Sequence, residues 1–429
     1  MSEFVVNGGR PLKGELVVPG SKNAALSLLS AVVLADGHSV LHNVPRVSDT
    51  AVKASLLERF GARVEWHEGS LYIDASQLQP RTVDDEAVRS IRTSFFLLGP
   101  LLARIGRVSI AAPGGCKIGA RPLDYHLKGL AKMGAQIEFR GGVYHAKTKG
   151  LVGSEIYLDS PSPGATQHLM SAAVLAKGNT VIENAAMEPE VTTLADYLNR
   201  MGAVIEGAGT PRITVKGVEG LTACEFRVPA DRIQAGTYMI AAAITNGDVT
   251  VRGIMPEDQT ALTNKLREAG VNVTEGSESI RVEGIGRTGP VKIKTMPYPG
   301  FPTDLQQPMC ALASIADGSS FIEETIYENR IGHIDELNRM GAKIRIEGRV
   351  TVVEGVERLS GCHVEATDLR AGAALVLAGL AAEGETTVHN LKYIDRGYED
   401  LEKNLNLLGG SVKRVPSDGE ALPRAEALY

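Results

Sequence analysis

The sequence has no large excess of charge of one sign, few cysteines and no long apolar run. Its 45 Lys and Arg residues nearly balance 51 Asp and Glu residues, and the net charge of −6 provides no overall basic field for a nucleic acid. The four cysteines form no Cys-x-x-Cys pair, which argues against a zinc ribbon or a disulfide framework. No uninterrupted apolar run approaches 18 residues, and no basic segment followed by an apolar one opens the chain. We therefore expect a cytoplasmic protein with no signal peptide and no membrane span.

Several motifs of cofactor chemistry are also missing. The chain contains no P-loop and no G-x-G-x-x-G segment after a strand-like run. His126 and His333 stand alone, and no cluster of histidines or carboxylates has the spacing of metal ligands. The sequence predicts no metal and no cofactor.

One pattern recurs along the whole chain. The phrase Leu-x-x-(apolar)-Gly precedes a strand-like segment six times at intervals of 68 to 73 residues, with its glycines at Gly61, Gly134, Gly202, Gly270, Gly341 and Gly409. A second marker, a glycine that closes an alanine-rich apolar run, has the same period and falls at Gly37, Gly106, Gly178, Gly247, Gly318 and Gly384. Two independent markers with one period predict six copies of one structural unit.

Within each unit we expect a β-α-β-α-β-β series. In the first copy the strand 15–19 precedes an apolar helix over 22–35, the strand 39–44 follows Gly37, and a second helix over 50–60 ends at Gly61. The strands 62–66 and 71–74 complete the unit. The strand 225–229 and the helix 234–245 repeat this opening. Because the first helices are apolar nearly all round, we expect them inside a layer of sheet and outer helices.

Six units of about 70 residues predict two inside-out α/β domains of three repeats each. We assign residues 21–229 to one domain, and residues 1–20 and 230–415 to the other. The chain would then cross between the domains twice. The segment 416–429, which has two prolines and a Ser-Asp-Gly turn, is expected to be a poorly ordered tail.

The first helices have unusual residues at equivalent starting positions. Counting fourteen or fifteen residues back from each glycine of the second marker gives Lys22, Arg92, Gly164, Arg232, Asp304 and Arg370. Cations at a helix N-terminus oppose the helix dipole, so four of them in six positions suggest an anionic ligand. The alternative is that charged residues simply mark helix ends at the surface.

A second set of positions lies about twelve residues after the same glycines, at Asp49, Glu190, Asp258, Arg330 and Arg396. The second unit departs from this spacing by an insertion, the cysteine loop Pro113-Gly-Gly-Cys-Lys-Ile-Gly-Ala-Arg121. Lys117 and Arg121 would lower the pKa of the Cys116 thiol, which could then act as an acid or a nucleophile. The alternative for Cys116 is a buried or incidental cysteine in a hairpin loop, which is how we interpret Cys224, Cys310 and Cys362.

Asp304 is the one acid among the six helix starts. It is either an ordinary N-cap or, opposite a group of cations, a general base for a substrate hydroxyl. Lys22 is likewise either a solvated helix start or part of the anion site.

These motifs resemble the enolpyruvyl transferase family, and in particular its branch that acts on UDP-N-acetylglucosamine. The resemblance covers residues 1–415 and is carried by Pro19-Gly-Ser-Lys-Asn-Ala24, Pro113-Gly-Gly-Cys-Lys-Ile-Gly-Ala-Arg-Pro122, Phe301-Pro-Thr-Asp304, Tyr327-Glu-Asn-Arg330, Ala366-Thr-Asp-Leu-Arg370 and Ile394-Asp-Arg-Gly-Tyr398. It implies two inside-out domains with an active-site cleft between them, and transfer of the enolpyruvyl group of phosphoenolpyruvate to the sugar 3′-hydroxyl with release of phosphate. The resemblance also implies that this step begins peptidoglycan precursor synthesis and that the protein is a target of fosfomycin.

The resemblance also implies roles for individual residues. Lys22, Arg92, Arg121 and Arg396 would hold phosphoenolpyruvate, and Asp304 would be the base. Cys116 would supply acid or covalent chemistry and help in product release. The positions matched to substrate contacts are Asn23, Arg121, Pro122, Leu123, Asp124, Tyr125, Ser162, Gly164, Asp304, Ile326, Arg330 and Arg370. The chain departs from the family near the sugar nucleotide, where Ser160 stands at a position that is a lysine in many relatives.

Two other functions are compatible with this scaffold. Enolpyruvylshikimate-phosphate synthase shares the phosphoenolpyruvate site, but the Cys116 loop argues against it. A non-catalytic paralogue is the other, and the presence of Lys22, Cys116, Asp304 and Arg396 argues against that.

Overall fold

The computed structural model describes residues 2–114, 118–119 and 122–416. The predictions for Cys116, Lys117 and Arg121, and for the tail beyond Pro416, lie outside these residues. The described chain divides into two compact units: unit 1 comprises residues 2–19, 118–119 and 230–416, and unit 2 comprises residues 20–114 and 122–229. No helix among the described residues is long and apolar enough to cross a membrane.

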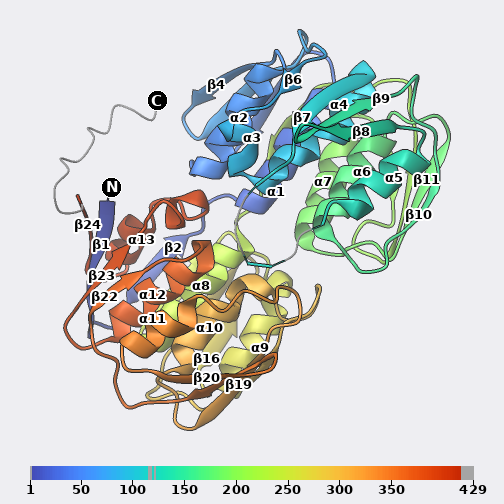
Figure 1. Ribbon diagram of the computed structural model, residues 1–429. Coiled ribbons are helices and arrows are strands. Elements are labelled where there is room, and N and C mark those ends of the chain that lie inside the picture. Colours follow the sequence, from blue (N-terminus) through green and yellow to red (C-terminus); the bar gives the residue numbers. More distant parts are fainter. Residues whose placement is uncertain (1, 115–117, 120–121, 417–429) are drawn as a thin grey trace. The chain divides into compact units, whose positions relative to one another are not determined.

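Unit 2 contains three four-stranded sheets with the orders β14-β3-β5-β4, β6-β7-β9-β8 and β10-β11-β13-β12 (Figure 1). Their strands are β3 (His38–His42), β4 (Arg63–His67), β5 (Ser70–Asp74), β6 (Thr82–Val83), β7 (Arg107–Ala111), β8 (Gln136–Arg140), β9 (Val143–Lys147), β10 (Glu155–Tyr157), β11 (Asn179–Glu183), β12 (Val204–Glu206), β13 (Arg212–Lys216) and β14 (Glu225–Arg227). The helices are α1 (Lys22–Ala31), α2 (Ser48–Arg59), α3 (Glu86–Ser90), α4 (Leu98–Ile105), α5 (Asp124–Lys132), α6 (Pro163–Ala173) and α7 (Pro189–Arg200), with 3₁₀ turns η1 (Val32–Leu34) and η2 (Arg92–Leu97).

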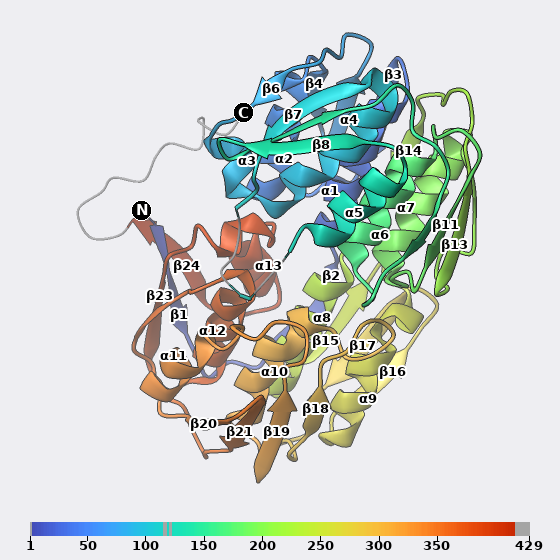
Figure 2. The ribbon, with the colours of Figure 1, turned by 45° about the vertical axis from the view of Figure 1, so that its right-hand side comes forward.

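Unit 1 contains three sheets of the same kind, with the orders β16-β17-β15-β2, β18-β19-β21-β20 and β22-β23-β1-β24 (Figure 2). Their strands are β1 (Ser2–Asn7), β2 (Lys13–Val17), β15 (Asp248–Arg252), β16 (Asn272–Glu275), β17 (Ser279–Glu283), β18 (Lys292–Lys294), β19 (Ser319–Glu323), β20 (Lys343–Glu347), β21 (Val350–Glu354), β22 (His363–Glu365), β23 (Glu385–His389) and β24 (Val412–Pro416). The helices are α8 (Arg232–Ile244), α9 (Thr260–Glu268), α10 (Gln306–Ala313), α11 (His333–Arg339), α12 (Leu369–Ala381) and α13 (Leu401–Leu407), with 3₁₀ turns η3 (Pro256–Gln259), η4 (Thr303–Leu305) and η5 (Ile394–Arg396).

The first helix of each repeat lies at the centre of its unit. In α8 every residue from Ile233 to Ile244 is buried, and α8, α10 and α12 pack against one another. Each unit has its own apolar core. Helices inside and sheets outside is the reverse of the usual α/β layering, and it explains why these helices are apolar all round. The predicted pair of inside-out domains is confirmed.

Two equivalent strands have exchanged places between the repeats. Strand β2, which precedes α1 in the chain, pairs in parallel with β15, whereas β14, which precedes α8, pairs in parallel with β3. The strand near residues 15–19 therefore does not belong to the sheet of the helix that follows it. Strand β1 lies between β23 and β24 and completes the sixth sheet, so the start of the chain fills the place of a hairpin strand (Figure 2).

The six Leu-x-x-(apolar)-Gly phrases end the second helices in one common way. Their glycines all have positive φ, between 86° and 105°. In each case the N–H after the glycine donates to the carbonyl five residues earlier, at 2.9 to 3.1 Å, as Ala62 does to Leu57. This is the Schellman arrangement, in which a left-handed residue satisfies the last helical carbonyls. The repeated phrase is therefore a repeated helix stop.

We expect substitution of these glycines to separate backbone strain from steric clash. Gly134 has φ 88° and an added Cβ would meet nothing within 4 Å, so Gly134→Ala should cost about 1–2 kcal/mol of unfolding free energy from the left-handed conformation alone. At Gly61 the added Cβ would also lie 2.5 Å from the Gln77 carbonyl oxygen. Urea denaturation should therefore show a larger loss for Gly61→Ala. Equal losses would contradict this account.

Candidate active site

All six helix-start positions found in the sequence begin an inner helix or the 3₁₀ turn that leads into one. Lys22 and Arg232 are the first residues of α1 and α8, Arg92 opens η2, and Asp304 lies in η4. Gly164 and Arg370 are the second residues of α6 and α12. The interpretation as ordinary surface helix ends is wrong for Arg370, whose side chain is only 2 % exposed.

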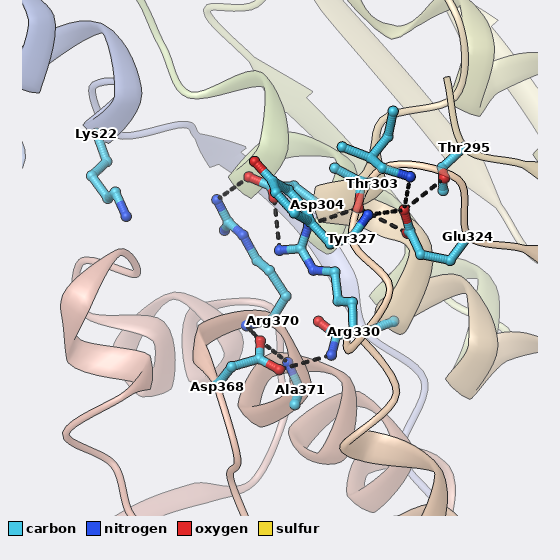
Figure 3. Close-up of polar contacts among 12 residues, drawn as sticks. Lys22, Thr295, Thr303, Asp304, Glu324, Tyr327, Arg330, Asp368, Arg370 and Ala371 are labelled. Atoms are coloured by element: carbon cyan, nitrogen blue, oxygen red, sulfur yellow. Dashed lines mark hydrogen bonds and ion pairs between the residues drawn. The ribbon is translucent and has the colours of Figure 1, made fainter. Parts of the chain in front are cut away.

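In unit 1 the structure brings Asp304, Arg330 and Arg370 together. One carboxylate oxygen of Asp304 lies 2.7 Å from Nη2 of Arg330, and the other lies 3.2 Å from Nη2 of Arg370 (Figure 3). Both arginine side chains are buried, whereas that of Asp304 is 26 % exposed. Asp304 caps no helix, because the N-cap of η4 is Pro302 and makes no side-chain cap. Asp304 is thus the accessible end of a buried ion cluster, and its interpretation as an N-cap is wrong.

The two arginines remain charged in spite of their burial. Burial alone would lower the pKa of Arg330, but the charges of Asp304 and Asp368 raise it above its usual value. Burial also opposes the charge of Arg370, while Tyr398 and Asp304 raise the pKa of that group. The guanidinium of Arg370 lies 5.1 Å from the ring centroid of Tyr398, within the range of a cation–π contact. Each carboxylate oxygen of Asp304 therefore meets a fixed positive charge, and the two contacts orient the carboxylate.

A buried carboxylate, Glu324, holds the backbone around this cluster. It is 7 % exposed and accepts hydrogen bonds from the Thr295 hydroxyl at 2.9 Å and from the Thr303 hydroxyl at 2.8 Å. It also accepts from the N–H groups of Ile326 and Tyr327 at 2.7 and 3.0 Å (Figure 3). Glu324 therefore ties η4 to the segment that leads to Arg330. Nothing in the sequence distinguished it from other strand-end acids.

Thr303 links Glu324 to the ion cluster. Its hydroxyl donates to Glu324 and accepts from Nη1 of Arg330 at 2.9 Å. The same guanidinium turns Nη2 toward Asp304. Thr303 therefore fixes the orientation in which Arg330 meets Asp304.

We expect Thr303→Val to lower the free energy of unfolding by about 1–3 kcal/mol, since a buried carboxylate oxygen and a buried guanidinium N–H lose their partner while the volume is unchanged. Thr303→Ser keeps the hydroxyl and removes one methyl group, so its cost should stay near or below 1 kcal/mol. Urea denaturation of the two variants measures the difference. A valine variant as stable as the serine variant would show that the hydroxyl bridge contributes nothing.

Asp368, which also escaped the sequence reasoning, shapes the start of α12. It is the N-cap, and its carboxylate accepts from the N–H groups of Arg370 at 2.9 Å and Ala371 at 3.1 Å. The Gln307 amide donates to its other oxygen at 2.9 Å. The cap fixes the first turn of the helix, and with it the backbone of Arg370. Its place two residues before Arg370, ahead of an apolar run, is a recognisable cap signal.

In unit 2 the equivalent positions form an ion pair of opposite polarity. Nζ of Lys22 lies 3.1 Å from a carboxylate oxygen of Asp49, and both side chains are largely buried, at 12 % and 5 % exposed. The first repeat thus has the cation on its first helix and the acid on its second, whereas the fifth repeat has Asp304 and Arg330. The interpretation of Lys22 as a solvated helix start is wrong.

Arg92 is positioned from two sides. Its Nη2 donates to the Pro122 carbonyl at 3.1 Å. The next residue, Thr93, accepts at its carbonyl from Nζ of Lys53 at 2.5 Å. Lys53 is fully buried, and this burial lowers its pKa well below the usual value. Its place on the apolar stripe of α2, three residues from Thr50 and from Leu56, is the sequence signal that could have revealed it.

The other predicted contact residues occupy several elements. Ser162 is the N-cap of α6 and accepts from Ala165 at 3.3 Å. A Cβ on Gly164 would lie 2.8 Å from the Phe96 ring, so a side chain there would displace it. The remaining positions are Asn23 in α1, Leu123 before α5, Asp124 and Tyr125 in its first turn, Ile326 after β19, and Arg396 at the end of η5.

The described part of the cysteine loop contacts the Arg330 segment. The Ile118 carbonyl accepts from the N–H of Asn329 at 3.0 Å, and both residues belong to unit 1.

The surroundings of the other three cysteines agree with their interpretation as buried or incidental. Cys310 is buried, which raises its thiol pKa to about 12, and burial also raises the pKa of Cys224 and Cys362. Such thiols are poor nucleophiles. Among the described residues no three His, Cys, Asp or Glu side chains are arranged to hold a metal ion.

Comparison with known proteins first defines the class. Residues 6–405 match the family model of EPSP synthase (3-phosphoshikimate 1-carboxyvinyltransferase). The enolpyruvyl transferase NikO from Streptomyces tendae superposes with a TM-score of 0.87 at 24 % identity, covering 96 % of this chain and 99 % of that one. EPSP synthase from Acinetobacter baumannii superposes with a TM-score of 0.75 at 20 % identity, covering 97 % and 100 %. The fold is thus that of the enolpyruvyl transferases.

Closer relatives define the branch. The UDP-N-acetylglucosamine 1-carboxyvinyltransferase of Trichlorobacter lovleyi is 51 % identical over 97 % of this chain and 99 % of its own. The protein named UDP-N-acetylglucosamine 1-carboxyvinyltransferase 1 of Halalkalibacterium halodurans is 48 % identical over 100 % and 98 %. The chain belongs to the UDP-N-acetylglucosamine 1-carboxyvinyltransferase family.

Proposed function

We propose that this protein transfers the enolpyruvyl group of phosphoenolpyruvate to the 3′-hydroxyl of UDP-N-acetylglucosamine and releases inorganic phosphate. The observation that carries this proposal is a sequence identity of 51 % and 48 %, over nearly the whole length, to relatives named UDP-N-acetylglucosamine 1-carboxyvinyltransferase. The ion cluster around Asp304 supports it, because it presents a partly exposed carboxylate beside two buried guanidinium groups.

Phosphoenolpyruvate would be held by cations. Its phosphate and carboxylate carry up to three negative charges, which several fixed cations compensate better than one. Lys22, Arg92, Arg121 and Arg396 are assigned to this role. The hydrogen bond from Arg92 to the Pro122 carbonyl and the Lys22–Asp49 pair would orient two of them before the substrate arrives.

The sugar nucleotide would be bound by backbone and polar groups. Asn23, Arg121 to Tyr125, Ser162, Gly164, Asp304 and Ile326 are assigned to it. Glu324 would act here as a positioning residue, since it holds the N–H of Ile326 and the hydroxyl of Thr303 beside Asp304.

In the addition step Asp304 would take the proton of the sugar 3′-hydroxyl. The hydroxyl oxygen of the sugar would bond to C2 of phosphoenolpyruvate while C3 gains a proton. The hydroxyl becomes strongly acidic only as the new bond forms, so a carboxylate stabilised by two guanidiniums can still accept the proton. In the elimination step C3 loses a proton and the bond from C2 to the phosphate oxygen breaks. Arg330 and Arg370 would hold the Asp304 carboxylate in place through both steps.

Cys116 would supply acid or covalent chemistry on phosphoenolpyruvate. Its neighbours Lys117 and Arg121 favour a thiolate. It is also the residue on which an inhibitory effect of fosfomycin would depend. The proposed setting is the cytoplasm, where this reaction would begin the synthesis of peptidoglycan precursors.

The test is phosphate release from phosphoenolpyruvate with UDP-N-acetylglucosamine or shikimate 3-phosphate as acceptor. We expect release only with the sugar nucleotide, and loss of that release after fosfomycin treatment of the wild type. The Cys116→Ala variant lacks the thiol with which fosfomycin would react. Its phosphate release without the inhibitor therefore shows how far the transfer itself depends on the thiol. Release with shikimate 3-phosphate alone would refute the proposed acceptor.

A further inference from the structure

The outer face of the sheet β6-β7-β9-β8 in unit 2 carries an unusual group of cations. Along β7 the residues Val108 and Ile110 are buried in the core, so Arg107 and Ser109 point to the other face. The register places Lys147 and His145 of β9 opposite them. We call the four cations on this side the basic face: Arg81, Arg107, Arg140 and Lys147.

Two of these cations lie directly opposite each other. Arg107 and Lys147 are paired residues of neighbouring antiparallel strands. Like charges in this relation destabilise a sheet. Among the described residues no ion pair of Arg107, Arg140 or Lys147 with a carboxylate occurs, and both Arg107 and Lys147 are exposed. The fold gains nothing from this juxtaposition.

The other repeats show how this fold normally treats such positions. Four of the other five sheets carry at least one ion pair between their own strand residues: Arg63–Glu65, Arg212–Glu183, Arg281–Asp248 and Arg345–Glu347. In the remaining sheet Nδ1 of His389 lies 2.9 Å from a carboxylate oxygen of Glu3. On the sheet β6-β7-β9-β8 no such pair occurs among the described residues. This one sheet of six therefore keeps its cations without strand carboxylates to pair with them, which indicates that the cations serve a purpose other than folding.

The basic face surrounds a groove of about 580 Å³. Arg81 is held at its edge by neutral acceptors, with Nη1 donating to the Arg59 carbonyl at 3.0 Å and Nη2 to the Gln79 amide oxygen at 3.4 Å. The Ser109 hydroxyl and Nδ1 of His145, 2.9 Å apart, add hydrogen-bonding groups to the lining. The lining contains these four cations and one acid, Glu138, and together these five groups carry a net charge of +3.

We propose that this groove binds a small anion bearing two or more phosphates, either inorganic pyrophosphate or the diphosphate of a nucleotide. Three arginines can make paired hydrogen bonds to phosphate oxygens, and a volume of this size holds a small ligand rather than a macromolecule. None of the residues that line the groove is assigned to the transfer reaction. This proposal does not rest on the proposed function.

The test is calorimetric titration of the full chain with inorganic pyrophosphate and, separately, with ADP. We compare the wild type with Arg107→Ser, Lys147→Ser and the double variant. Loss of a charge-assisted hydrogen bond weakens binding about tenfold, so each single variant should bind about tenfold more weakly and the double variant should show no heat from this site. Pyrophosphate alone, ADP alone or both giving heat identifies the source of the phosphates.

A matched control and a second measurement keep the test decisive. Arg345→Ser removes an exposed strand arginine that is paired with Glu347 at 2.8 Å, and it should leave the titration unchanged. Thermal unfolding without ligand should show the double variant at least as stable as the wild type, since a repulsion is removed. Pyrophosphate or ADP should raise the melting temperature more for the wild type than for the double variant. Identical titrations for both proteins, or a double variant that is less stable without ligand, would overturn the proposal.

Phosphate release in the transferase assay separates this proposal from the proposed function. The double variant should retain the wild-type rate whether or not the groove binds phosphates. Loss of pyrophosphate and ADP binding with the rate intact assigns the ligand to the groove alone.

Discussion

Asp304→Asn is expected to lower kcat for phosphate release by a factor of about 10²–10⁴, the usual contribution of a general base. The substitution keeps the shape of the side chain and removes the group that would take the hydroxyl proton. Arg330 and Arg370, at 2.7 and 3.2 Å, would then face a neutral amide. We measure kcat and KM by phosphate release, and binding of UDP-N-acetylglucosamine by calorimetry. The asparagine amide can still form a hydrogen bond to the sugar hydroxyl, so loss of the base alone should leave binding of the sugar nucleotide largely in place, whereas loss of a purely structural residue should weaken it.

Stability has to be followed in the same variant, because a buried ion cluster loses its shared anion. Removing one partner of a buried pair costs about 3–5 kcal/mol, so kcat is compared well below the melting temperature. The matched control is Asp248→Asn, since Asp248 meets Arg281 with two hydrogen bonds of 2.7 Å but lies at the surface. The control should cost at most about 1 kcal/mol and leave kcat unchanged. A kcat for Asp304→Asn within about tenfold of the wild type would remove Asp304 from the role of base.

His333→Leu is expected to make the protein less sensitive to acid. His333 begins α11, is fully buried, and its two ring nitrogens have no hydrogen-bond partner in the described part of the chain. Burial lowers its pKa to about 4, with Arg330 contributing in the same direction and Asp368 opposing. In the unfolded chain the pKa of a histidine is about 6.5. The folded protein therefore holds this side chain neutral where the unfolded chain would protonate it.

The sign of the pH dependence follows from proton uptake. Between pH 6.5 and about 4 the unfolded state binds the extra proton, so stability is constant above this window and falls as the pH drops through it. His333 alone should account for a loss on the order of 2 kcal/mol between pH 7.5 and 5.0. His168 adds a loss of the same sign, because its burial, together with the charges of His126 and Lys53, lowers its pKa well below the usual value.

Urea denaturation at pH 7.5 and 5.0 checks this prediction. His333→Leu should lose less stability than the wild type over the interval, by on the order of 2 kcal/mol. The same substitution at His38, whose side chain is 81 % exposed, should leave the pH dependence as it is. A wild-type pH profile in His333→Leu would mean that this ring does not control acid sensitivity.

The structure confirms most of the repeat pattern and shows where the pattern could mislead. The helix stop at Gly61 and its five equivalents depends only on neighbouring residues, since a left-handed glycine and a buried leucine five residues before the capping N–H suffice. The choice of strand partners, in contrast, does not depend on neighbouring residues alone. Nothing local distinguishes β2 from β14, and their exchange depends on which of two equivalent sheets each strand reaches.

The same division holds for the candidate site. Lys22, Asp304 and Arg370 were found by their position in the repeat, because each repeat begins its inner helix at one place. Glu324, Thr303 and Lys53 were missed, since their role depends on contacts across 21 to 40 residues of sequence. A carboxylate that accepts four hydrogen bonds looks like any other acid until its partners are known.

The sequence by itself determined the six repeats, their helix stops, the apolar inner helices and the charged residues that start them. Each of these features follows from the spacing and type of neighbouring residues, because helix ends and buried helix faces depend on local backbone geometry and on the helical period. Only the tertiary structure decided that Asp304 is shared by Arg330 and Arg370, that Lys22 meets Asp49, and that β1 completes the last sheet. Such pairings depend on distances across the fold and on the loss of water around buried charges, and neither is encoded at any single position.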